Sequence, residues 1–98
     1  MTINKSLNDT ELTVALEGRL DTITAPELEE ALSGDIDNAQ SLVLDFEKLE
    51  YISSAGLRVL LSAHKNMSKK GGMKILHVND IIMEIFEVTG FSDILTIQ

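Results

Sequence analysis

Strand-like and helix-like patterns alternate along this chain of 98 residues, and their order constrains the fold more than any other feature. Leu12, Val14 and Leu16 alternate with less apolar residues, which is the period of two expected for a strand with one buried face. Gly18 breaks this alternation and marks the expected end of the strand.

A short amphipathic helix is expected over residues 24–32, with Thr24 as the candidate N-cap and Pro26 in the first turn. After it, the polar residues 35–40 predict a loop. The nearly continuous apolar run at residues 42–46 predicts a strand covered on both faces, and such strands favour parallel pairing.

The longest helix is expected from Ser54 to about Lys70, where Gly71 and Gly72 stop it. Its apolar stripe consists of Leu57, Leu60, Leu61, His64 and Met67. The basic residues near its end are expected to be solvated rather than to bind a ligand, and they are Lys65, Lys69 and Lys70.

A strand is then expected over residues 73–78, followed by a helix that Asn79 and Asp80 cap and Gly90 ends. The predicted buried side of this helix consists of Ile81, Ile82, Ile85, Phe86 and Val88. Residues 94–97 predict a last short strand, and the N-terminal end leaves room for one more.

The alternation of strands and helices predicts an α/β fold. We expect a single domain over residues 1–98, in which three to four helices pack on a mixed, largely parallel sheet of four to five strands. No internal repeat or linker divides the chain.

Composition argues against several classes of function. Cysteine is absent, which removes disulfides, thiolate nucleophiles and the common structural zinc sites and favours a cytoplasmic protein. A formal net charge of −8 repels phosphate backbones, so direct binding to nucleic acid is not expected. No apolar stretch reaches the roughly 18 residues of a membrane span. No long unbroken apolar surface demands a dimer, and we expect a monomer or a weak dimer.

Enzymatic activity is not expected either. The only imidazoles are His64 on the helical stripe and His77 within a predicted strand, and both are expected to be structural. The acidic runs at residues 29–30 and 47–50 are typical of a solvated surface rather than of acid–base pairs or metal ligands. We therefore expect no catalytic residue, no cofactor and no metal.

Residues 49–58, with the sequence LEYISSAGLR, resemble the STAS-domain family of anti-sigma-factor antagonists. In that family a strand ends in an apolar pair and is followed by Asp-Ser-Ser/Thr-Gly-Leu, whose first Ser is the phosphorylation site. The aligned residues here are Ser53, Ser54, Ala55, Gly56 and Leu57. The resemblance therefore places the phosphorylatable position at Ser54, with Ser53 as the competing acceptor.

Other motifs extend the resemblance over essentially the whole chain. Residues 18–21, followed by Thr24 and Ala25, are similar to the family's Gly-x-Leu-Asp turn before the first helix. Residues 70–72 are similar to its Gly-Gly turn, and residues 86–91 to its Phe-x-x-x-Gly-hydrophobic ending. The joint order and spacing of these motifs predict a STAS domain over residues 1–98.

The resemblance implies a switch protein that regulates transcription. When unphosphorylated, such a protein binds an anti-sigma factor with ATP-dependent serine kinase activity and so releases a sigma factor. Phosphorylation at Ser54 ends that binding, and a serine phosphatase restores it. ATP belongs to the kinase, so the chain itself needs no nucleotide site. The alternative is a STAS scaffold or interaction module that is not phosphorylated.

The residues expected to contact the partner surround Ser54 and the turn after the first strand. They are Asp21, Thr22, Ser53, Ser54, Ala55, Gly56 and Arg58. A hydroxyl at a helix start is placed to cap that helix, and Arg58, four residues after Ser54, is placed to pair with a phosphate there. Two departures from the family pattern affect this site: Ser53 replaces an Asp, and Ala55 removes an alternative phosphoacceptor.

Overall fold

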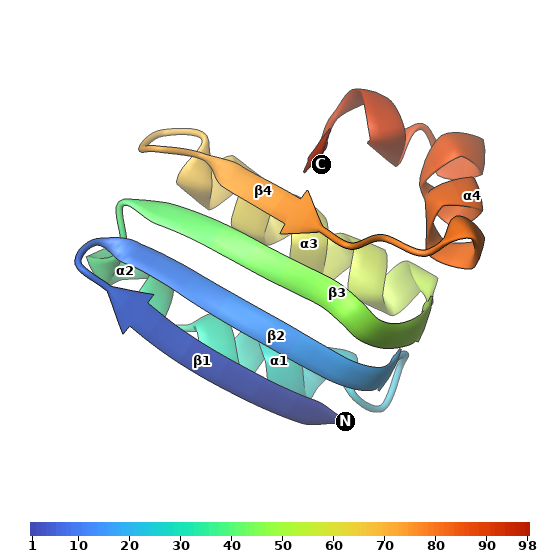
Figure 1. Cartoon of the computed structure of the whole chain (residues 1–98), viewed down its shortest axis with the longest axis horizontal. Helices are drawn as coiled ribbons and strands as arrows, with labels where there is room; N and C mark the ends of the chain where they lie inside the picture. The colour runs from blue at the N-terminus through green and yellow to red at the C-terminus, as the bar shows by residue number, and fades with distance from the viewer.

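The computed structural model describes residues 1–98 and contains one five-stranded sheet with helices packed against one face (Figure 1). The strands are β1 (Thr2–Asn8), β2 (Glu11–Leu20), β3 (Ser41–Ile52), β4 (Met73–Leu76) and β5 (Thr96–Ile97). The helices are α1 (Ala25–Leu32), α2 (Asp35–Asn38), α3 (Ser54–Met67) and α4 (Asp80–Thr89), followed by a 3-10 turn at Phe91–Asp93. This architecture confirms the predicted α/β fold.

The strands follow one another across the sheet in the order of the sequence, β1-β2-β3-β4-β5. β1 pairs antiparallel with β2, and every other pair of neighbours is parallel. Parallel neighbours need a crossover connection, which α1 and α2 supply between β2 and β3 and α3 supplies between β3 and β4. The sheet is therefore mixed and largely parallel, as predicted.

The core lies between the sheet and helices α1, α2 and α3, which Figure 1 shows behind the strands. The prediction that β3 is covered on both faces is wrong, because these helices cover only one. Leu44 and Phe46 are fully buried, whereas Asp45 between them lies half-buried on the opposite face. We call the face without these helices the open face. No helix combines the length and the apolar content that crossing a bilayer requires.

β2 and β3 extend further than their apolar patterns predict. Gly18 does not end β2, because its φ of +109° fits an irregularity at which the β2–β3 register shifts, and the strand then continues. β3 likewise continues to Ile52. β4, in contrast, ends at Leu76, so His77 lies outside the strand in which it is predicted and has a φ of +59°.

The helix ends agree with the sequence in part. The side chain of Asn79 caps α4 by accepting the N–H of Ile82 at 2.8 Å, and Gly90 ends that helix with a left-handed φ of +82°. Residues 35–38 form α2 instead of a loop, and α3 ends at Met67 rather than near residue 70.

The buried face of α4 is narrower than predicted. Ile82 and Phe86 are its only buried residues, whereas 60% of Ile81 and 80% of Val88 are exposed. Figure 1 shows α4 beyond the tip of β4, at the end of the sheet. At that place only one narrow stripe of the helix meets the core, so the pattern of apolar residues overestimates its burial.

Lys70 joins α2 to the turn after α3. Its ammonium group donates to the backbone carbonyls of Ile36 at 2.7 Å, Asp37 at 3.1 Å and Ala39 at 3.0 Å. These carbonyls lie at the C-terminal end of α2, where a cation is favourable. The prediction that Lys70 is merely solvated is therefore wrong.

Candidate functional site at the carboxyl end of the sheet

The carboxyl ends of β2 and β3 meet at one end of the sheet. Leu20 and Ile52 are register partners in this parallel pair, and the N–H of Ser53 donates to the carbonyl of Leu20 at 2.8 Å. The turn that begins at Asp21 and the start of α3 therefore lie side by side. Parallel pairing thus brings the two predicted parts of the site together.

Asp21 organises the turn after β2. Its carboxylate accepts the N–H groups of Ile23 and Thr24, both at 3.0 Å, and the hydroxyl of Thr24 at 3.2 Å. Hydrogen bonding, led by the Thr24 N–H, holds the pKa of Asp21 below its usual value of 3.8, and the nearby charge of Arg19 adds to this effect. The Thr24 hydroxyl has one proton, which it shares between Asp21 and the closer Arg19 carbonyl at 2.7 Å, and it does not cap α1. Asp21 therefore stays ionised and keeps the turn in one shape.

The two serines at the start of α3 have opposite environments. Ser53 is the N-cap residue, but its side chain makes no capping hydrogen bond, and its hydroxyl oxygen is buried without a partner. Ser54 is the first residue of the helix and is exposed. The prediction that the Ser54 hydroxyl caps α3 is therefore wrong, because the N-cap position belongs to Ser53 and no side chain caps the helix. The exposed hydroxyl of the pair is that of Ser54.

Gly56 lets the start of α3 approach the sheet closely. A Cβ atom at this position would lie 2.7 Å from Cγ of Leu20 and 2.8 Å from Cγ1 of Ile52. Gly56 is buried and Ala55 is partly buried against the core, so both lie beneath the surface expected to meet a partner. Arg58 is exposed on α3 and takes part in none of the ion pairs of the protein.

Ile23 is a surface residue that sequence reasoning misses. It follows the exposed Thr22 in the turn, and 81% of it is exposed, the largest such fraction among the big apolar residues. From hydrophobicity alone, an isoleucine such as Ile23 is expected in the core. The available signal is its position directly after Asp21 and Thr22, in a turn rather than a strand or helix.

Residues 2–98 match the STAS domain family. The chain belongs to this family. This STAS domain is 35% identical over 88 residues to BtrV of Bordetella bronchiseptica, which is named as a candidate anti-sigma factor antagonist, with 88% of the chain and 76% of that protein covered. It is 29% identical over 92 residues to the anti-sigma-B factor antagonist of Bacillus subtilis, with 93% of the chain and 84% of that protein covered.

The fold of this STAS domain also matches solved structures. The crystal structure of an anti-sigma factor antagonist from Mycobacterium paratuberculosis superposes with a TM-score of 0.88 at 25% sequence identity. That match covers 98% of this chain and 83% of the other. The resemblance stated from the sequence motifs is thereby confirmed at the level of family and fold.

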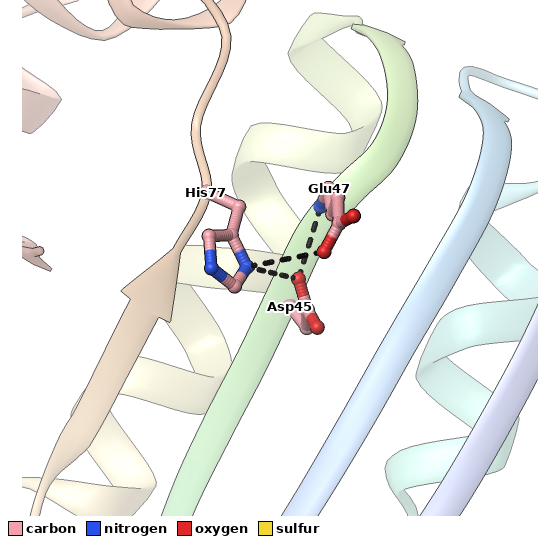
Figure 2. A group of neighbouring side chains, drawn as sticks. All are labelled: Asp45, Glu47 and His77. Carbon is pink, nitrogen blue, oxygen red and sulfur yellow. Dashed lines mark hydrogen bonds and ion pairs between the residues drawn. The ribbon is translucent and has the colours of Figure 1, made fainter.

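A second group of polar side chains lies on the open face of the STAS domain (Figure 2). Nδ1 of His77 lies 2.8 Å from Oδ1 of Asp45 and 3.7 Å from Oε2 of Glu47. The hydrogen bond to Asp45 raises the pKa of His77 above its usual 6.5. Partial burial acts to raise the pKa of Asp45, but the bonds from His77 and from the Glu47 N–H outweigh it and leave that pKa below 3.8.

The low pKa of Asp21 predicts a pH-dependent contribution to stability. The folded pKa lies below the unfolded value of 3.8, so ionised Asp21 stabilises the STAS domain above that value, and the contribution is lost as the pH falls through the folded pKa. We expect Asp21→Asn to be less stable than the wild type at about pH 7, with the difference shrinking near pH 3. Urea denaturation at both pH values measures it.

Thr22→Ala is the matched control for Asp21→Asn. Thr22 is an exposed residue of the same turn, and its side chain has no titratable group. Its effect on the free energy of unfolding should be the same at both pH values. A constant difference between Asp21→Asn and the wild type across this range would contradict the role of the ionised carboxylate.

Proposed function

We propose that this STAS domain is a cytoplasmic anti-sigma factor antagonist that is switched by phosphorylation of Ser54. When unphosphorylated, it binds an anti-sigma factor with ATP-dependent serine kinase activity, and a sigma factor is released. The same kinase phosphorylates Ser54 and dissociates, and a serine phosphatase restores binding. The names of the relatives support the antagonist function, and they agree with a chain that is not an enzyme.

The environment of Ser54 is the observation that supports this switch best. Its side chain is exposed at the start of α3 and neither donates nor accepts a hydrogen bond within the protein. The hydroxyl oxygen of Ser53, in contrast, is buried. A kinase needs access to the hydroxyl that it phosphorylates. The contrast favours Ser54 over Ser53 as the acceptor.

The position of Ser54 also explains why a phosphate there changes binding rather than folding. The first N–H groups of a helix have no partner within the helix, and the helix dipole stabilises a nearby negative charge by about 0.3–1 kcal/mol. Arg58, one turn further along α3, is exposed and placed to pair with a phosphate. A partner that covers Ser54 and the Asp21 turn, in contrast, meets the added volume of the phosphate and its charge of about −1.5 to −2.

Mass spectrometry after incubation with the cognate kinase and ATP tests the modification. We expect one phosphate on Ser54 in the wild-type chain and none in Ser54→Ala. Ser53→Ala is the matched control and should still be phosphorylated at Ser54. A chain that remains unmodified, or a phosphate on Ser53, contradicts the proposal.

The affinity of the partner tests the consequence. Ser54→Asp should bind the kinase at least tenfold more weakly than the wild type, a change of about 1.4 kcal/mol. Ser62→Asp adds the same charge at an exposed position two turns further along α3, and its affinity should stay within twofold. If Ser54→Asp binds as tightly as the wild type, the domain acts as an interaction module without this switch.

A further inference from the structure

Asp45, Glu47 and His77 come from two neighbouring parts of the sheet. Asp45 and Glu47 are two residues apart on β3, on either side of the buried Phe46. Asp45 is the register partner of Leu76, the last residue of β4, so His77 follows directly beside it. Figure 2 shows the two carboxylates and the imidazole turned toward one another on the open face.

The three side chains converge more closely than their hydrogen bonding requires. One oxygen or nitrogen from each lies within 4.8 Å of the other two. Asp45 is bonded to His77, but the Glu47 carboxylate approaches the same Nδ1 at 3.7 Å, which is too long for a hydrogen bond. Two carboxylates therefore lie against one nitrogen, where a metal ion bound to Nδ1 would replace the proton that His77 shares with Asp45.

We propose that Asp45, Glu47 and His77 bind one divalent transition-metal ion. Two donor atoms bound to the same ion at about 2.1 Å lie roughly 3.0–3.4 Å apart at octahedral to tetrahedral angles. The separations from His77 Nδ1, 2.8 Å and 3.7 Å, bracket this range. Small side-chain rotations would thus suffice to bind an ion, because 56% of the His77 side chain and 68% of the Glu47 side chain are exposed.

The mixture of ligands indicates the class of metal. Imidazole favours zinc and iron, and carboxylates also suit manganese, whereas magnesium and calcium prefer sites made of oxygen alone. The imidazole therefore distinguishes this group from the ordinary acidic surface that the sequence predicts at residues 47–50. We expect Zn²⁺ and Mn²⁺ to bind and Mg²⁺ not to compete.

Space for the remaining ligands lies next to the two carboxylates. A depression of about 350 Å³ on the open face is lined by Asn4, Ala15, Leu16, Glu17, Asp45, Glu47 and Lys48. Three protein ligands leave at least one coordination position for water or an anion. The charges of Glu17 and Lys48 in the wall of the depression offset each other. Asp45 and Glu47 therefore give the depression a net negative charge.

Calorimetric titration of the full chain with ZnCl₂ tests the proposal. We expect one ion per chain, with affinity at least tenfold lower in Glu47→Gln and in His77→Asn. Asparagine is chosen because it tolerates the positive φ of residue 77 better than most residues. Glu50→Gln changes another exposed acid of β3 outside the group and should bind within twofold of the wild type.

Paramagnetic broadening by MnCl₂ locates the ion. Amide signals of residues 45–48 and 76–78 should broaden first in the wild type and should not do so in His77→Asn. Absence of binding at millimolar Zn²⁺, equal affinity in both ligand variants, or broadening centred elsewhere would overturn the proposal. Because Ser54 and its partner take no part in these measurements, their outcome is independent of the proposed switch.

Discussion

Phe86→Ala is expected to lower the free energy of unfolding by about 3–5 kcal/mol, a large fraction of the total stability of a domain of this size. Phe86 is completely buried and is one of only two buried residues of α4. Its removal leaves a cavity and deprives α4 of its largest contact with the core. Urea denaturation measures the loss, and the circular dichroism of the variant shows whether α4 remains formed.

Val88→Ala is the matched control for Phe86→Ala. Val88 belongs to the same helix and to the buried side predicted from the sequence, but 80% of it is exposed. Its truncation should change stability by no more than about 0.5 kcal/mol. Similar losses in the two variants would mean that α4 buries the wider face that its apolar pattern predicts.

Gly56→Ala is expected to destabilise the domain by about 1–3 kcal/mol, the usual cost of overpacking a core. In an exposed helix the same change stabilises by up to about 1 kcal/mol, so the sign of the effect is itself diagnostic. Here the new Cβ would overlap Leu20 and Ile52, at 2.7 Å and 2.8 Å, and both of these side chains are fully buried. Denaturant unfolding of the purified variant measures the change.

A double-mutant cycle with Leu20→Ala identifies the cause. Leu20 supplies two of the three atoms nearest the added methyl group, so truncation of Leu20 makes room for that methyl group. Gly56→Ala should therefore cost less in the Leu20→Ala background, by about 0.5–3 kcal/mol of coupling. Strict additivity, or a Gly56→Ala variant as stable as the wild type, would contradict the close approach of α3 to the sheet.

Local patterns predict the elements of this fold better than their limits or their surroundings. The alternation of Leu12, Val14 and Leu16 predicts β2, but the strand continues past Gly18 because pairing with β3 outweighs the local preference for a turn. The apolar residues of α4 predict a helix, but which of them are buried depends on where the helix lies against the sheet. Ile81, for example, belongs to the apolar pattern but is exposed.

The candidate site likewise has features that the local sequence predicts and features that depend on the fold. The motif around Ser54 predicts its place at the start of α3, and the structure puts it there. Phosphorylation and partner binding stay predictions. The burial of the Ser53 hydroxyl depends on tertiary packing around the start of α3, which no local pattern encodes. The group formed by Asp45, Glu47 and His77 is also invisible in the sequence, because it needs the parallel register of β3 and β4.

The antiparallel pairing of β1 places its two ends at opposite ends of the sheet, so labels on β1 can report which end a partner covers. Thr2 pairs with Glu17 toward the end of the sheet where Ser54 lies, whereas Asn8 pairs with Glu11 toward the opposite end, about 20 Å away. Since the chain has no cysteine, one thiol introduced at either exposed position accepts a single dye without other labelling. A partner that covers the Ser54 end would change the emission of the dye on residue 2 and leave the dye on residue 8 unaffected.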